Sequence, residues 1–222
     1  VNSNGKGPVS AEWMIPKALW LKQNEVEIFD NAVTICEYQD YLNFHLTGRR
    51  VSSINNVSTR WHFDFSEGRN GSKESVPRSL LEKLGLGDLA KKWPVEVIRL
   101  GEVIGGLTSE AAEHLGLPIG TQVVQGGADA QIGMIGLGVV QPGSLALITG
   151  SSHLQLGLSD KPFHGEGIWG TYSDALIPGL YTVEGGQTST GSVINWLKNI
   201  FGEYDYSSLN KDANDLPPGS EG

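Results

Sequence analysis

Three short segments of the sequence combine glycines with polar side chains, and each follows residues that favour a β-strand. The first is Gly126-Gly127-Ala128-Asp129-Ala130. Its two glycines let the backbone turn tightly and let a substrate come close, and an Asp at the start of a helix is placed to accept a proton from a substrate hydroxyl. The same Asp could simply cap the following helix, and spacing alone favours the cap.

The second segment is Thr149-Gly150-Ser151-Ser152, between two predicted strands. Backbone amides and hydroxyls in a tight glycine turn form a concave anion site, which phosphoryl transfer needs near the γ-phosphate. A plain hairpin turn explains the same residues, and the segment taken alone favours that interpretation.

The third segment, residues 184–191, leads into a helix predicted over residues 190–201. A segment rich in glycine and hydroxyl groups at the start of a helix can bind a phosphate, because the first helical amides point outward. The alternative is a loop in which Thr190 caps the helix. The segment is neither a Walker P-loop nor a Rossmann fingerprint, because its residue types and spacing differ from both. All three segments are predicted at strand ends, where open α/β sheets bind ligands.

The elements around these segments follow from apolar spacing and from glycine and proline positions. Asn55-Asn56 predicts a turn, residues 67–75 predict a polar surface loop, and Pro142-Gly143 marks a candidate domain boundary. Helices are expected near residues 16–24, 25–32, 37–47 (ended by Gly48), 77–84, 108–115 (capped by Thr108) and 130–137, and strands from residue 123 and over 144–148, 153–158 and 181–184.

Composition limits the classes of protein. The 222 residues are 39% apolar and 18% charged, which fits one and a half or two folded domains. A net charge of −9 argues against a broad nucleic-acid surface, and the apolar runs are too short to span a membrane. Cys36 is the only cysteine, so no intrachain disulfide forms, and we expect a reducing, cytoplasmic location. Both ends suggest a piece of a longer chain.

In combination, the three segments resemble the FGGY family of carbohydrate kinases. Residues 126–130 resemble the family's catalytic Asp segment, and residues 148–152 resemble its second phosphate loop, with Ser151 where Thr is usual. Residues 184–191 are similar to a Glu-Gly-Gly-Gln run of ribulokinase-like members, and residues 191–197 resemble the nucleotide-side helix of glycerol kinases. Residues 14–21 look like a variant of the N-terminal signature.

The resemblance implies an α/β fold of two ribonuclease H-like domains of the actin-like ATPase type. Residues 1–140 would be the rear part of the N-terminal sugar-binding domain, and residues 141–222 the front part of the C-terminal nucleotide-binding domain. The sequence holds neither the family's Asp-x-Gly-Thr loop nor its late Gly-Gly adenine segment. We therefore expect an internal fragment that is inactive by itself.

The resemblance also implies roles for individual residues. Asp129 would be the catalytic base, and Arg60 and Glu184 would bind the substrate with it. A surface Arg60 stacked on Trp61 and a solvated Glu184 are the alternatives. The nucleotide-binding residues would be Gly150, Ser151, Gly186, Gln187, Gly191 and Asn195, and no residue is assigned to a metal.

The implied activity is phosphorylation of a sugar or polyol hydroxyl by ATP with Mg²⁺. A ketopentose such as ribulose is the expected substrate, as part of a longer chain. The partners would be the sugar and ATP, with no nucleic acid or membrane, and a homodimer is compatible with the sequence. The alternative is a non-catalytic sugar-binding or scaffold protein on a truncated kinase fold.

Overall fold

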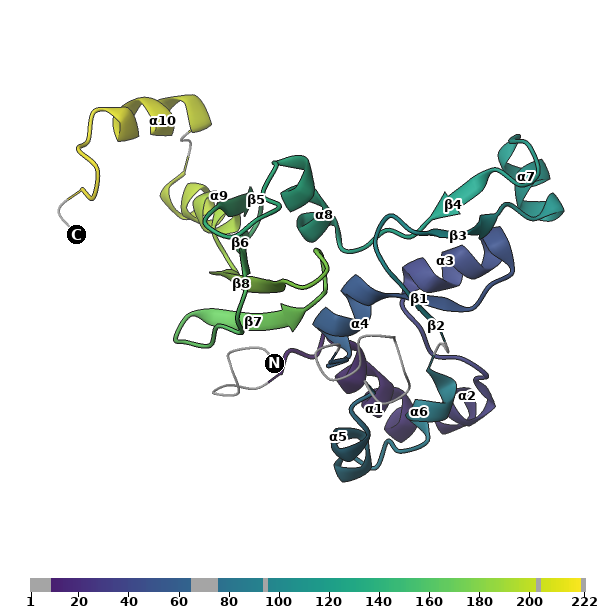
Figure 1. Ribbon diagram of the computed structural model, residues 1–222. Helices are drawn as coiled ribbons and strands as arrows, with labels where there is room; N and C mark the ends of the chain where they lie inside the picture. Colours follow the sequence, from purple (N-terminus) through teal and green to yellow (C-terminus); the bar gives the residue numbers. More distant parts are fainter. Residues whose placement is uncertain (1–8, 65–75, 94–95, 203–204, 221–222) are drawn as a thin grey trace.

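The computed structural model describes residues 9–64, 76–93, 96–202 and 205–220 (Figure 1). The helices are α1 (Met14–Asn24), α2 (Val26–Asn31), α3 (Tyr38–Thr47), α4 (Ile54–Arg60), α5 (Arg78–Lys83), α6 (Leu89–Lys92), α7 (Ser109–Leu115), α8 (Asp129–Gly136), α9 (Gly191–Phe201) and α10 (Tyr206–Asn214). The strands are β1 (Val51–Ser53), β2 (Glu96–Ile98), β3 (Val103–Gly106), β4 (Gln122–Val124), β5 (Leu145–Thr149), β6 (His153–Ser159), β7 (Ile168–Ser173) and β8 (Tyr181–Gln187).

The first half of the chain is built around one large apolar core. This core gathers α1, α2, α4, α5 and α6, with Phe29 and Trp61 fully buried and Trp93 packed 4.3 Å from Trp61 between ring centroids. Above it, β1 pairs in parallel with β2, and β3 pairs antiparallel with β4. The core fixes the position of α4, whose last turn reaches the candidate site.

The second half contains an antiparallel sheet in the order β5-β6-β8-β7. Met134 on α8 is buried against this sheet together with Ala146 and Leu156. Figure 1 shows α8 beside β5 and β6, where the chain passes from β4 into the second half. The helix that begins at Asp129 is therefore packed on the sheet, and it begins at the junction between the two halves of the chain.

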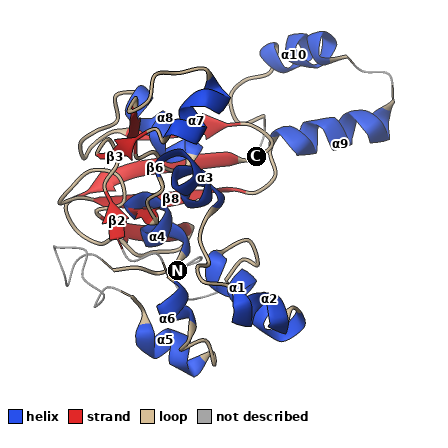
Figure 2. Cartoon of the chain, turned by 90° about the vertical axis from the view of Figure 1, so that its right-hand side faces the viewer, coloured by secondary structure: helices blue, strands red, loops and turns tan. Residues whose placement is uncertain are grey.

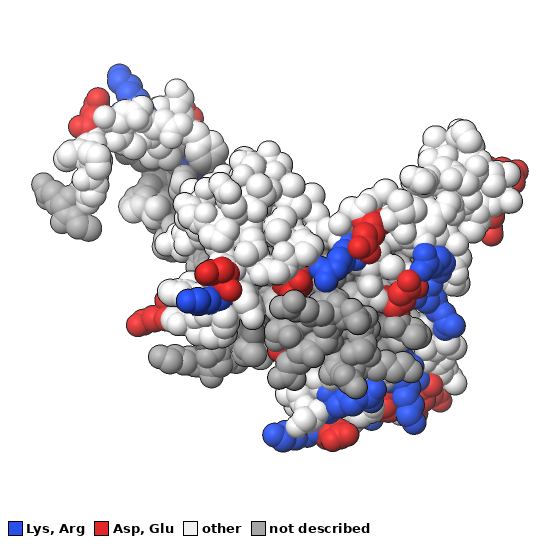
Figure 3. Space-filling model, in the orientation of Figure 1, with Lys and Arg blue, Asp and Glu red and all other residues white. Residues whose placement is uncertain are grey.

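The last two helices project from the body of the molecule (Figure 2). Neither α9 nor α10 contains a buried residue, and Trp196 on α9 is 59% exposed. On the face shown in Figure 3, Lys and Arg side chains are most numerous towards the bottom of the view, where Asp and Glu side chains lie among them. Within the described residues, no helix has the length and apolar character that crossing a membrane requires.

Locally encoded features agree with the sequence. Gly48 ends α3 in the left-handed conformation, with φ 74°. Thr108 caps α7, because its hydroxyl accepts a hydrogen bond from the N–H of Ala111 at 3.2 Å. The strands β5 and β6 form the predicted antiparallel hairpin.

Two predictions are wrong, and one lies outside the description. Asn55 and Asn56 lie inside α4 rather than in a turn, because both side chains are buried and bonded to distant partners. The strand β8 continues through Gln187, since Gly185 and Gly186 pair with residues of β6. The polar loop expected at residues 67–75 falls outside the described residues.

Candidate active site

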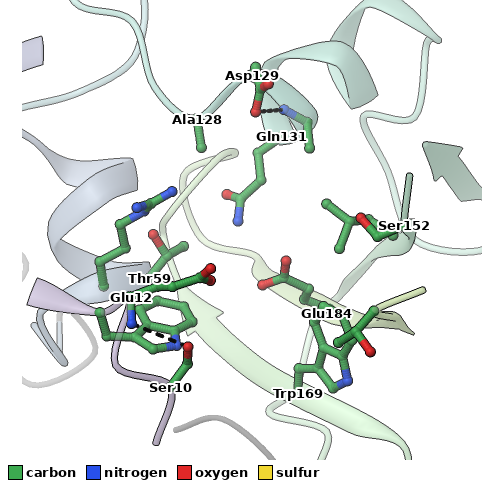
Figure 4. Close-up of a pocket in the computed structure, with 14 residues that line it drawn as sticks. Ser10, Glu12, Thr59, Ala128, Asp129, Gln131, Ser152, Trp169 and Glu184 are labelled. Atoms are coloured by element: carbon green, nitrogen blue, oxygen red, sulfur yellow. Dashed lines mark hydrogen bonds between the residues drawn. The ribbon is translucent and has the colours of Figure 1, made fainter. Parts of the chain in front are cut away.

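A cavity of about 550 Å³ lies where the two halves meet (Figure 4). Its walls come from the segment before α1, the end of α4, the start of α8, and strands β6, β7 and β8. The lining residues are Ser10, Glu12, Trp13, Thr59, Arg60, Ala128, Asp129, Ala130, Gln131, Ser152, Leu154, Trp169, Glu184 and Thr188. The lining therefore includes all three residues expected to bind the substrate: Arg60, Asp129 and Glu184.

Asp129 is the first residue of α8 and is exposed at the cavity. Its Oδ1 accepts a hydrogen bond from the N–H of Ala130 at 2.8 Å, and the residue at the cap position is Ala128. Among the described residues, Oδ2 has no hydrogen-bond donor. The carboxylate is thus fixed through one oxygen while the other can take a proton.

The glycine before Ala128 is explained by a close approach of the backbone to Asn55. A Cβ on Gly127 would lie 2.6 Å from Asn55 Oδ1, which no side chain tolerates without a shift. Asn55 in turn accepts the N–H of Ala128 at 2.9 Å. The tight turn before Asp129 is therefore held by a buried side chain of α4.

Glu184 faces the cavity from β8, opposite Asp129 (Figure 4). The hydroxyl of Tyr172 donates to Glu184 Oε2 at 2.8 Å, and Gly170 leaves room for the tyrosine ring. Burial raises the pKa of the Glu184 carboxyl, while the bond from Tyr172 and the positive charge of Arg60 work against that rise. Burial and the neighbouring carboxylate raise the pKa of Tyr172, which stays a hydrogen-bond donor. The carboxylate of Glu184 is therefore fixed by a hydrogen bond from the protein and is not freely solvated.

Arg60 ends α4 at the cavity wall. The neighbouring Trp61 belongs to the core, where its Nε1 donates to Glu37 Oε1 at 3.0 Å. In the described part of the chain, no cation–π contact joins Arg60 to Trp61. The alternative of an Arg60 stacked on Trp61 therefore has no support among the described contacts, and the role of Arg60 towards a substrate stays a prediction.

The glycine loop after β5 is bonded to the start of α9. The carbonyl of Ser151 accepts the N–H of Thr190 at 2.9 Å and the hydroxyl of Ser192 at 3.2 Å. A Cβ on Gly191 would lie 2.6 Å from the carbonyl oxygen of Gly150, so the two segments touch. The N–H groups of Ser151 and Ser152 donate to no acceptor in the described chain. These free amides and the exposed hydroxyl of Ser151 fit a phosphate group.

The expected nucleotide residues do not all gather in one place. Gly150, Ser151 and Gly191 share the loop junction, whereas Gly186 and Gln187 pair with residues of β6 and Asn195 is exposed on α9. None of the six lines the cavity, whose wall on that side is formed by Ser152 and Thr188. In the part of the chain that the structure describes, no three His, Cys, Asp or Glu side chains could hold a metal ion.

Several lining residues are not among the site residues that the sequence predicts. Glu12 and Trp13 precede α1, and Gln131 lies two positions after Asp129. The only sequence signal for Gln131 is its position two residues after the candidate base, in the first turn of the same helix. Glu12 and Trp13 reach the site through tertiary folding.

Known proteins are similar to this chain in fold and in sequence. A xylulose kinase from Rhodospirillum rubrum superposes with a TM-score of 0.76 over 98% of the chain and 43% of its own length, at 24% identity. A FGGY carbohydrate kinase domain-containing protein from Xenopus laevis is 32% identical over 93% of the chain and 40% of its own length. A ribulokinase from Geobacillus thermodenitrificans is 35% identical over 86% of the chain and 33% of its own length. The chain thus spans well under half the length of these relatives.

The α/β architecture is that of the actin-like ATPase, or ribonuclease H-like, fold of sugar kinases. Residues 6–136 match the N-terminal domain of the FGGY family of carbohydrate kinases, and residues 145–217 match its C-terminal domain. The chain belongs to the FGGY family of carbohydrate kinases.

Proposed function

We propose that the whole protein transfers a phosphoryl group from ATP, with Mg²⁺, to a hydroxyl of a sugar or polyol. A ketopentose such as ribulose is the proposed substrate class. The observation that carries this proposal is the cavity lined by both Glu184 and Asp129, which has one unbonded carboxylate oxygen. The similarity to proteins named ribulokinase supports the choice of sugar.

The side chains divide the work between binding and proton transfer. Glu184 accepts hydrogen bonds from sugar hydroxyls, and Arg60 donates to them from the end of α4. Asp129 accepts the proton of the attacking hydroxyl, because a sugar hydroxyl is a poor nucleophile without a positioned base. ATP, when bound, supplies the phosphoryl group.

The nucleotide is proposed to lie on the side of the glycine loop. Gly150 and Ser151 steady the γ-phosphoryl group during transfer. Ser151 donates to it from its free amide and its hydroxyl, whereas Gly150 forms the tight turn, with its own N–H bonded to the carbonyl of Ser152 at 2.9 Å. Gly186, Gln187, Gly191 and Asn195 are proposed for the remainder of the nucleotide side. We also propose that residues 1–140 and 141–222 are parts of the two family domains, a division supported by the separate matches to residues 6–136 and 145–217.

A substrate screen tests this function. The full-length protein is incubated with ATP, Mg²⁺ and a panel of pentuloses, hexuloses and pentitols, and ADP release is measured. We expect sugar-dependent ADP release, greatest for a ketopentose. ADP release that no sugar or polyol stimulates would contradict the proposal, and sugar binding without turnover would favour the non-catalytic alternative.

A further inference from the structure

Gln131 is a buried amide at the cavity wall. It is 4% exposed, lies on α8 two residues after Asp129, and lines the cavity. Figure 4 shows its side chain reaching from α8 into the space above Glu184. A buried amide needs hydrogen-bond partners on both its oxygen and its nitrogen. The bonds that the protein makes to Gln131 therefore show which of these two atoms is left for a ligand.

Backbone groups fix which way this amide points. The N–H of Ala128 can only donate, and it donates to Asn55 Oδ1 at 2.9 Å. Asn55 Nδ2 therefore lies on the other side, where it donates to the carbonyl of Ala175 at 2.9 Å and to Gln131 Oε1 at 2.5 Å. Because each contact is anchored on a backbone donor or acceptor, the oxygen of Gln131 is held against Asn55.

The nitrogen of Gln131 is consequently left for the cavity. Among the described residues, Nε2 donates to no acceptor, although it carries two N–H groups. The charged acceptors Glu12, Asp129 and Glu184 line the same cavity. A sugar hydroxyl can donate to one of these carboxylates and accept from Gln131 at the same time.

We propose that Gln131 is a specificity-determining residue that donates a hydrogen bond to one oxygen of the substrate, a hydroxyl or carbonyl other than the hydroxyl that is phosphorylated. Asn55 acts through it as a positioning residue, because it holds the amide oxygen away from the cavity. This inference rests on the proposed sugar kinase function. It adds a neutral donor to the charged residues Arg60 and Glu184.

A substrate that lacks this oxygen leaves a buried N–H unpaired. Leaving such a group unpaired lowers the specificity constant by about 10- to 100-fold. The loss should be confined to one position of the sugar. It should also disappear when the amide is removed, because an apolar side chain has no donor to leave unpaired.

The test is a double-mutant cycle between Gln131 and the sugar oxygens in the full-length protein. The best substrate of the screen is compared with its monodeoxy analogues in wild type, Gln131→Leu and Asn55→Ala. The exposed Gln155 of β6 gives the matched control, Gln155→Leu. We expect wild type to discriminate against one analogue by about 10- to 100-fold, and Gln131→Leu to discriminate against that analogue by less than about threefold.

The ratios for the other analogues should stay at wild-type values in Gln131→Leu and in the control. Asn55→Ala should weaken discrimination against the same analogue alone, which a purely structural role would not do. Uniform losses for every analogue, with phosphorylation intact, would overturn the role of Gln131 and leave the kinase function standing. If no sugar is phosphorylated, calorimetry with the same variants and analogues decides, and the absence of any sugar binding overturns both.

Discussion

Asn55 should contribute more to stability than any other single polar side chain near the site. It is fully buried and bonds the N–H of Ala128, the carbonyl of Ala175 and the amide oxygen of Gln131, which lie 73, 120 and 76 residues away along the chain. Asn55→Ala would leave all three groups without this partner. Each unpaired buried group costs about 1–3 kcal/mol, and since water from the neighbouring cavity can replace part of the loss, we expect about 3 kcal/mol in total.

Urea unfolding of the full-length protein measures this loss directly. The control is Asn24→Ala, because exposed Asn24 makes one bond, from Nδ2 to the carbonyl of Trp20 at 2.9 Å. We expect the control to change the free energy of unfolding by about 0.5 kcal/mol or less. If Asn55→Ala is as stable as Asn24→Ala, the three bonds do not hold the turn before Asp129, and the account of that turn is wrong.

Three further predictions follow from other contacts. Gly170→Ala would place a Cβ 2.2 Å from the hydroxyl of Tyr172, so we expect a loss of about 1–3 kcal/mol in thermal unfolding and a higher KM for the sugar, whereas Gly136→Ala, with nothing within 4 Å, should not destabilise. Burial, aided by the charge of Glu37, raises the pKa of Asp40 to about 7. Between pH 4 and 7 the folded state therefore binds a proton that the unfolded state has lost, so the free energy of unfolding falls as pH rises. Asp40→Asn should remove this pH dependence when unfolding is measured across the same range. Ser151→Ala should lower kcat by about 10²–10³ with little change in sugar affinity, and normal turnover would make the loop a simple hairpin turn.

Features of the fold that depend on neighbouring residues could be predicted from the sequence. Gly48 and Thr108 end and begin helices through bonds within one turn, so their types are sufficient signals. The sequence predicts a turn at Asn55, and this prediction is wrong because partners more than 70 residues away hold Asn55 inside a helix. The extent of β8 was underestimated because Gly185 and Gly186 have low strand propensity, and only pairing with β6 keeps them extended.

Part of the candidate site could be predicted from the sequence, and part of it could not. Asp129, Arg60 and Glu184 line one cavity, and two of them lie in segments that carry the family resemblance. Gln131 and Glu12 carry no comparable motif, because their position at the cavity depends on how α4, α8 and the segment before α1 meet. The type of a single residue does not indicate which elements pack together in the folded chain.

The central claim is that Asp129 is the general base of a sugar kinase. Asp129→Asn keeps the shape of the side chain and the bond from Ala130 but removes the basic oxygen. Turnover of the best sugar by the full-length protein should fall by about 10²–10⁴ while the melting temperature stays unchanged, because general-base contributions have this size. The control Asp212→Asn, on exposed α10, should keep wild-type turnover. An Asp129→Asn protein with near-normal turnover would contradict the assignment of the site.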